Sequence, residues 1–262
     1  MSTPRWSVAR AVRAIEGALD GRTHALLTLS EHEEAEAPRA RPTERVRPII
    51  DLRDFTPLSE VDRRAARLEL GWHNDERIHL CVGRLCPGKP QRALAQAWRK
   101  HAGPGDRLLL VGDGEDRPAI EGLAGDNIEL LGWRNDMARL MGAADALLVP
   151  SLGEGFSLVI LEALACGTPV FSTSVGGSEI IAAGDGRIVT TAEEVVRAAL
   201  ASPLTPASAE DRVTRAERHH TFASLDTVAE EFLAIYHRTA GRDRSTIDLR
   251  EETADRPAES AH

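Results

Sequence analysis

The chain has 262 residues, 42% of them hydrophobic and 28% charged, and this composition argues against a disordered, collagen-like or disulfide-rich protein. Its 41 acidic residues exceed its 32 basic ones, for a net charge of −9, so the chain lacks the basic surface that binds nucleic acids or anionic membranes. The longest apolar runs fall well below the roughly 20 residues that cross a bilayer, and the polar N-terminus lacks the apolar region of a secretory signal. We therefore expect a cytoplasmic globular protein.

The cysteines and lysines add two constraints. Cys81, Cys86 and Cys166 are scattered and match no disulfide or metal-binding spacing, so we expect reduced thiols and no bound metal. The basic residues are almost all arginines, and Lys89 and Lys100 are the two lysines of the chain.

Residues 1–50 predict too few elements for a domain of their own. A helix is expected at 9–21 and strands at 24–30 and 45–50, with a stretch rich in alanine, glutamate and proline between the strands. Such a segment needs something else to pack on, and the apolar surface that it leaves usually marks an interface.

Between residues 78 and 190, short apolar runs alternate with helical stretches. Strands are predicted at 78–85, 107–113, 128–133, 146–151 and 169–174, and helices at 91–101, 116–124, 135–144 and 156–167. Continuous apolar strands are buried on both faces, and helices between them imply right-handed crossovers. The predicted fold class is therefore α/β, with a doubly wound, Rossmann-like parallel sheet.

The pattern after residue 190 is helical. Helices are predicted at 192–202, around 210–219 and at 225–241. Residues 242–262 are dense in charge and poor in large apolar groups, so we expect a disordered tail. His219, His220 and His237 fall in the helical part, where we expect solvated histidines.

The segment 150–170 predicts a strand that ends in a glycine-containing turn and opens directly into a helix. A helix start offers free backbone N–H groups and the positive end of the helix dipole, so it is a natural phosphate site. Glu154 lies in the turn and Glu162 inside the helix, and carboxylates accept hydrogen bonds from hydroxyl groups. Two glutamates alone are also compatible with a solvated helix face. Beside a phosphate site they suit a sugar nucleotide.

The pattern of Glu154 and Glu162, followed by ALACGTPV and by GGSEII, closely resembles the donor half of retaining glycosyltransferases of the GT-B fold, the family 4 class. The segments 82–89, 108–123, 128–151 and 185–189 occur in that family's order and spacing. The resemblance implies a remnant of the N-terminal acceptor domain at 1–52, a linker at 53–77, a donor nucleotide-sugar-binding domain at 78–224, a C-terminal helix at 225–241 and the tail at 242–262.

In this family an arginine and a lysine in the loop after a donor-domain strand hold the nucleoside diphosphate. The resemblance assigns that role to Arg84 and Lys89, with Gly83 at the end of the strand. Two cations on one diphosphate would stabilise the charge that grows on the leaving group. A surface arginine and lysine beside a turn are the alternative. Pro90 departs from the family, which usually has glycine there, and so alters the loop after Lys89.

The resemblance assigns Glu162 to the ribose hydroxyls and Glu154 to the transferred hexose, and it groups Glu154, Arg84 and Lys89 as catalytic. The other donor-binding positions are the backbone amides of Gly155, Phe156, Ser157 and Leu158 and, against the base, Gly132, Trp133 and Arg134. Trp133 as plain core packing is an equal alternative. Glu179 is either a partner of the loop that closes the donor cleft or a helix cap.

The implied activity is transfer of a hexosyl group from a nucleotide sugar, a UDP-sugar first, to an acceptor with retention of configuration and without a cofactor. The family's glycine-rich N-terminal loop and active-site histidine segment are missing from the sequence. We therefore expect a partner chain or a second copy to complete the site. A truncated product with poor turnover and a non-catalytic nucleotide-sugar-binding module are the alternatives. No nucleic-acid partner is expected, and membrane association, the sugar and the acceptor stay open.

Overall fold

The structure is a computed structural model that describes residues 25–37, 42–48, 50–182, 184–202, 208–223 and 225–239. The helix expected at 9–21 and the tail expected at 242–262 lie outside the described residues. Among the helices that are described, none combines the length and the apolarity that a bilayer crossing requires.

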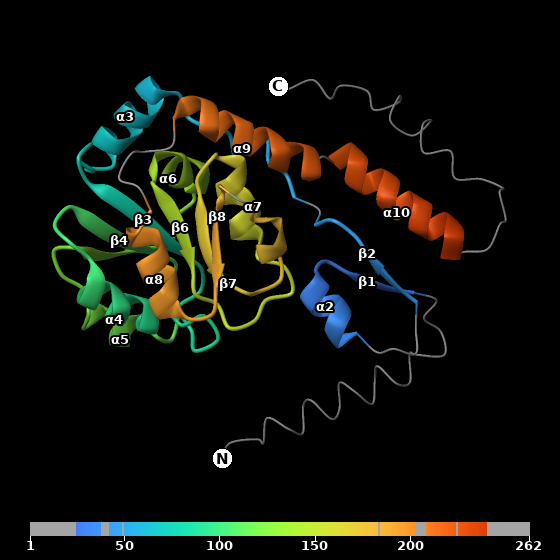
Figure 1. Cartoon of the computed structure of the whole chain (residues 1–262), viewed down its shortest axis with the longest axis horizontal. Coiled ribbons are helices and arrows are strands. Elements are labelled where there is room, and N and C mark those ends of the chain that lie inside the picture. The colour runs from blue at the N-terminus through green and yellow to red at the C-terminus, as the bar shows by residue number, and fades with distance from the viewer. Residues whose placement is uncertain are drawn as a thin grey trace, which may run out of the picture.

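Six parallel strands form the central sheet in the order β5-β4-β3-β6-β7-β8 (Figure 1). Their bounds are Arg77–Val82 for β3, Asp106–Val111 for β4, Ile128–Gly132 for β5, Ala146–Val149 for β6, Val170–Thr173 for β7 and Gly186–Val189 for β8. The predicted doubly wound parallel sheet is confirmed. The edge strand β8 was not among the predicted strands, because Arg187 and Ile188 are exposed and give no continuous apolar run.

Helices cover both faces of the sheet. Their bounds are Glu60–Glu69 for α3, Gln91–His101 for α4, Arg117–Glu121 for α5, Met137–Ala143 for α6, Leu158–Ala165 for α7, Ala192–Leu200 for α8, Ala209–Phe222 for α9 and Leu225–Thr239 for α10. Successive strand residues point to opposite faces. Leu80 and Leu147 therefore join one core, which includes residues of α6 and α7, whereas Cys81 and Leu148 join a second core with residues of α4 and α8.

Helix α3 lies in the stretch expected to be a linker, yet it packs on the central domain. Its arginines Arg63 and Arg67 are buried, and both form ion pairs with Asp145, at 2.6 and 3.1 Å. Asp145 also accepts a hydrogen bond from the backbone N–H of Ile78, at the start of β3. Residues before 78 are thus built into the fold of the central domain.

The N-terminal segment comprises β1 (Leu26–Thr28), α2 (Glu31–Glu36) and β2 (Thr43–Arg45), and its two parallel strands form a separate small sheet. In Figure 1 this segment lies apart from the central sheet, next to the end of α10. A small apolar cluster that includes Leu52, Leu161 and Ala223 joins the following residues to α7 and α9. This cluster joins residues 50–55, which follow the N-terminal segment, to the central domain.

Candidate functional site

The candidate site lies where the order of the strands reverses. Strand β3 pairs with β4 on one side and with β6 on the other, so their following helices cover opposite faces. In sheets of this kind ligands bind in the crevice outside the carboxyl ends of the strands at this point. The loops after β3 and β6 meet there, since the N–H of Leu152 donates to the carbonyl of Gly88 at 3.2 Å.

Close backbone packing fixes the loop after β3. Gly83 has φ +145, and a Cβ atom on Gly112 would lie 2.1 Å from the carbonyl oxygen of Gly83, so a side chain at 112 would push the two strand ends apart. The N–H of Leu85 donates to the carbonyl of Asp113, and the Gln91 side-chain amide donates to the carbonyl of Arg84. The loop that carries both predicted phosphate-binding cations is therefore held at both ends.

Lys89 and Glu154 come together across the crevice. The Nζ of Lys89 lies 3.3 Å from Oε1 of Glu154, whose side chain is 13% exposed. The hydroxyl of Ser151, two residues after β6, donates to the same Oε1 at 2.5 Å. The structure thus joins one predicted diphosphate-binding residue with the residue predicted to bind the hexose.

Arg84 lies farther out. Its side chain is 73% exposed, and its nearest acidic partner is Glu115, at 4.0 Å. An exposed pair at this distance holds a side chain only weakly. Arg84 is therefore free to move towards a ligand, but the structure does not bring it into contact with Lys89 or Glu154.

The start of helix α7 leaves several polar groups without partners. Within the described residues, the backbone amides of Gly155, Phe156 and Leu158 have no hydrogen-bond acceptor. Ser157 occupies the N-cap position without capping the helix, and its hydroxyl is buried and has no hydrogen-bond partner there. The amide of Ser157, predicted to face the donor, instead donates to the carbonyl of Gly176 at 2.8 Å.

Glu162 lies within α7 and is partly buried. Burial raises the pKa of its carboxyl above the ordinary value. Among the described residues no cation forms an ion pair with it, so its charge is left for a ligand to stabilise.

The turn predicted to face the base has one free aromatic ring. Trp133 is 77% exposed, so the alternative of core packing is wrong for this residue. Arg134 is held by Asp136 through hydrogen bonds of 2.7 and 2.6 Å, which raise the pKa of the guanidinium and lower that of the carboxyl. Gly132 has φ +67, and its carbonyl accepts from the N–H of Gly112, which ties this turn to the end of β4.

Glu33 is a neighbour of the site that the sequence reasoning missed. Its Oε1 lies 2.1 Å from the position that a Cβ on Gly155 would take, and its Oε2 accepts from the N–H of Leu29 at 2.8 Å. The Ser-x-x-Glu spacing of Ser30 and Glu33 is the local signal, because it is typical of a helix start in which the glutamate reaches back to the backbone. The N-terminal segment thus places a carboxylate directly against the loop before α7.

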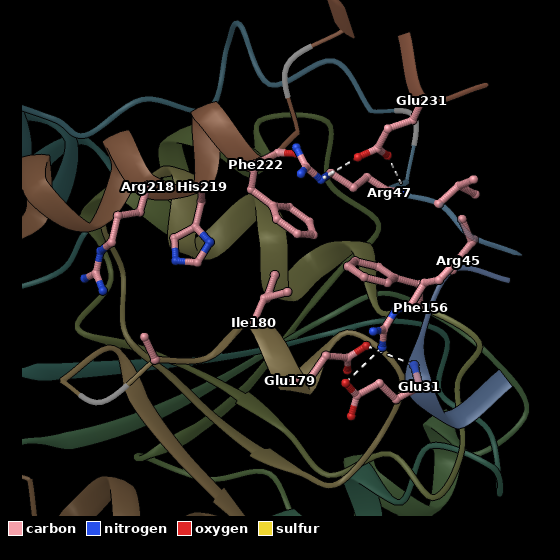
Figure 2. Close-up of a pocket in the computed structure, with 13 residues that line it drawn as sticks. Glu31, Arg45, Arg47, Phe156, Glu179, Ile180, Arg218, His219, Phe222 and Glu231 are labelled. Carbon is pink, nitrogen blue, oxygen red and sulfur yellow. Dashed lines mark hydrogen bonds and ion pairs between the residues drawn. The ribbon is translucent and has the colours of Figure 1, made fainter. Parts of the chain in front are cut away.

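A cavity of about 490 Å³ separates the N-terminal segment from the central domain. Figure 2 shows Phe156, Ile180 and Phe222 around it, with Glu179 and Glu31 at one end. Of the predicted donor-binding residues, only Phe156 lines this cavity.

Two arginines on the cavity wall form ion pairs with glutamates of the same wall. Arg45 binds Glu31 at 2.9 Å, and Arg47 binds Glu231 of α10 at 3.1 Å. Glu179 accepts a hydrogen bond from the backbone N–H of Glu31 at 3.4 Å, so it links the segment after β7 to the start of α2. The short helix of Glu179 has no side-chain cap, and the role of this residue in the loop that closes the donor cleft stays a prediction.

The histidines of the C-terminal region differ from the expectation of solvated side chains. His219 is buried beside Asp185, at 3.4 Å, and burial lowers its pKa. His220 is partly buried and lies 2.8 Å from the carbonyl of Phe55. His237 is exposed, as predicted.

Taken together, the fold and the crevice define a doubly wound α/β domain in which a helix start with unpaired polar groups lies at the switch point. Residues 76–202 match a family model described as Glycosyl transferases group 1. Among solved structures, Anabaena HepE in complex with UDP and glucose aligns with a TM-score of 0.73 at 21% identity, covering 86% of this chain and 66% of that chain.

The curated relatives agree with this match. The D-inositol 3-phosphate glycosyltransferase of Mycobacteroides abscessus is 40% identical over 150 residues, which are 53% of this chain and 33% of the relative. That of Mycobacterium avium is 35% identical over 217 residues, 74% of this chain and 48% of the relative. The chain spans about half or less of the length of these relatives. It contains a glycosyltransferase group 1 domain with the fold of GT-B glycosyltransferases.

Proposed function

We propose that the crevice between the β3 and β6 loops binds a nucleotide-sugar donor, and that the chain takes part in transferring its hexosyl group to an acceptor with retention of configuration. The observation that carries the proposal is the start of α7. Three backbone amides and the buried hydroxyl of Ser157 have no partner there, in the part of the chain that the structure describes. The buried hydroxyl of Ser157 costs stability unless a ligand or water satisfies it, and the open amides beside it suit a phosphate.

The groups around this helix start supply the remaining contacts. Lys89 offers a compact cation to the diphosphate, and Arg84 is free to fold onto it. Glu162 and Glu154 offer carboxylate oxygens to ribose and hexose hydroxyls. The exposed ring of Trp133 offers a face on which a base could stack.

In the proposed transfer, the bond between the anomeric carbon and the diphosphate oxygen breaks, and a bond to the acceptor oxygen forms on the same face of the sugar. The acceptor's proton passes to the departing phosphate oxygen. Lys89 and the amides of α7 would stabilise the charge that develops on that phosphate. Retention is proposed from the resemblance of the motifs, and the anomeric configuration of the product, measured by NMR, tests it.

The acceptor side is proposed to come from further polypeptide, either a partner chain or a second copy. Strands β1 and β2 are three residues each and, among the described residues, pair only with each other. Isolated two-stranded sheets are marginally stable, and parallel strands normally belong to larger, covered sheets. Leu27 of β1 is 46% exposed, which leaves apolar surface beside these open edges.

Calorimetric titration of the chain with UDP, GDP and ADP tests donor binding, with UDP first because the structural neighbour HepE was solved with UDP. Lys89→Ala should weaken binding of the preferred nucleotide about 10- to 100-fold, the range for loss of a charge-assisted contact. Lys100→Ala is the matched control, because Lys100 is 64% exposed and pairs with Glu193 on α8. Equal affinities of the two variants would rule out the phosphate assignment.

A non-catalytic binding module is the second candidate, because Arg84 stands apart from the other charged groups of the crevice. Hydrolysis or transfer of a bound sugar nucleotide separates the two. A chain that binds donor and neither hydrolyses nor transfers it, alone or with an acceptor-domain partner, is a module.

A further inference from the structure

Glu154 is already occupied in the free protein. Its Oε1 forms an ion pair with the ammonium of Lys89 at 3.3 Å and accepts a hydrogen bond from the hydroxyl of Ser151 at 2.5 Å. The Ser151 side chain is buried, so this hydroxyl holds the carboxylate in one orientation. Glu154 is therefore a fixed negative charge beside the cation that is proposed to receive the diphosphate.

The Lys89 side chain lies against the backbone beside this carboxylate. A Cβ added to Gly83 would lie 3.4 Å from both Cδ and Nζ of Lys89, which shows that the lysine side chain lies directly over the end of β3. A phosphate oxygen bonded to the ammonium lies about 2.8 Å from Nζ, and hence at most about 6 Å from Oε1 of Glu154. Any diphosphate that uses Lys89 therefore binds close to a like charge.

The carboxylate of Glu154 repels the nucleoside diphosphate product more strongly than it repels the nucleotide-sugar donor. In a nucleotide sugar the outer phosphate is a diester with one negative charge. In a free nucleoside diphosphate the same phosphate is terminal and ionises a second time near pH 6. The donor also brings hexose hydroxyls that can donate to the carboxylate, and the product brings none.

On the basis of the proposed function, we infer that Glu154 sets the preference between donor and product: its carboxylate, oriented by Ser151, opposes the free nucleoside diphosphate and so speeds its release. The residue then acts on specificity through charge, in addition to any contact with the hexose. A residue that only bound the hexose would leave the affinity for the bare nucleotide unchanged when replaced.

Glu154→Gln tests this, because the amide keeps the shape and can still accept from Ser151 while the charge is lost. We expect it to bind UDP, or whichever of GDP and ADP binds the wild type, about fivefold more tightly, the upper range for loss of one competing ion pair. Binding of the corresponding glucose nucleotide should not tighten. Glu115→Gln is the matched control, since it removes the same charge beside Arg84 from a side chain that is 66% exposed. It should leave the ratio of the two dissociation constants unchanged.

The pH dependence adds a readout that a structural effect would not share. Between about pH 8 and about pH 5 the terminal phosphate loses its second charge. The gap in UDP affinity between wild type and Glu154→Gln should therefore shrink, while thermal unfolding of both proteins is followed as a check on folding. Ser151→Ala should shift the affinity in the same direction by a smaller factor.

Two failures are distinguishable. If the wild type binds none of the three nucleotides, the proposed donor site is wrong and this inference falls with it. If the wild type binds a nucleotide and Glu154→Gln binds it equally or more weakly, or tightens nucleotide and nucleotide sugar alike, the donor site stands and the role of Glu154 in product release is refuted.

Discussion

Replacing Gly176 by alanine should displace the loop that forms the donor site. A Cβ at this position would lie 1.9 Å from the carbonyl oxygen of Gly155 and 2.5 Å from that of Glu154. Both atoms belong to the backbone, and two hydrogen bonds link residue 176 to this loop: the Gly176 N–H donates to the carbonyl of Glu154 at 3.1 Å, and the Ser157 N–H donates to the carbonyl of Gly176 at 2.8 Å. No flexible side chain can give way, so the loop before α7 has to move.

The size of the movement sets the size of the effect. Cβ atoms rarely approach another atom closer than 3.0 Å, so the carbonyl of Gly155 has to shift by about 1 Å. Inserting a methyl group into packed structure costs about 1–3 kcal/mol, and in a domain of this size each kcal/mol lowers Tm by about 2–4 °C. A 1 Å misplacement at a reacting centre costs about 100-fold in rate.

Gly153→Ala is the matched control. Gly153 lies in the same turn, and a Cβ added there meets nothing within 4 Å. Thermal unfolding and nucleotide titration of both variants should show a lower Tm and at least tenfold weaker binding for Gly176→Ala, with Gly153→Ala like the wild type. If the two variants behave alike, the close approach of residues 154–155 and 176 does not hold the donor loop, and the reasoning fails.

Three further predictions concern buried charge. Burial raises the pKa of Glu162, so ionisation of this carboxyl costs stability once the pH exceeds the ordinary carboxyl pKa. Glu162→Gln should therefore raise Tm at neutral pH and lose this stabilising effect in acid, as thermal melts across pH can show, and it should weaken nucleotide binding. Burial lowers the pKa of His79 from 6.5 to about 4, so between these pH values the unfolded chain binds one proton more than the folded chain. About 3 kcal/mol of unfolding free energy should be lost as the pH falls from 6.5 to about 4. His79→Phe should flatten this dependence of the unfolding free energy on pH, as measured by urea titrations. Asp145→Asn leaves the guanidinium groups of Arg63 and Arg67 without their carboxylate and should cost about 3–5 kcal/mol of unfolding free energy, whereas Asp126→Asn at the surface should cost almost nothing.

The sequence predicted the central sheet well, because strands buried on both faces are continuous apolar runs that need no knowledge of distant residues. Helix α3 shows where this stops. Its ten residues, EVDRRAARLE, contain six charged side chains, a composition that is also typical of a linker. Arg63 and Arg67 are nevertheless buried, and their partner Asp145 lies at the start of a strand far along the chain. No local pattern reveals a pairing of this kind.

The site was predictable to the extent that neighbouring residues form it. The helix start at α7 follows from the turn and the apolar run after it. The pairing of Lys89 with Glu154 arises because β3 and β6 are neighbours in the sheet, and strand order cannot be read from either segment. The contact of Glu33 with Gly155 was out of reach for the same reason: it joins the N-terminal segment to the central domain.

Charge accounts for the way the crevice would select its ligand. The described residues place Glu33 and Glu154 beside the start of α7 and Glu162 within that helix, and Lys89 forms an ion pair with Glu154. A polyanion would meet more repulsion than attraction at such a site, within a chain whose net charge is −9. A ligand with a small, localised anionic group and several hydroxyls satisfies both the helix start and the carboxylates. Nucleotide binding should therefore weaken only modestly with added salt, because amides and hydroxyl contacts, unlike a field of cations, are little screened.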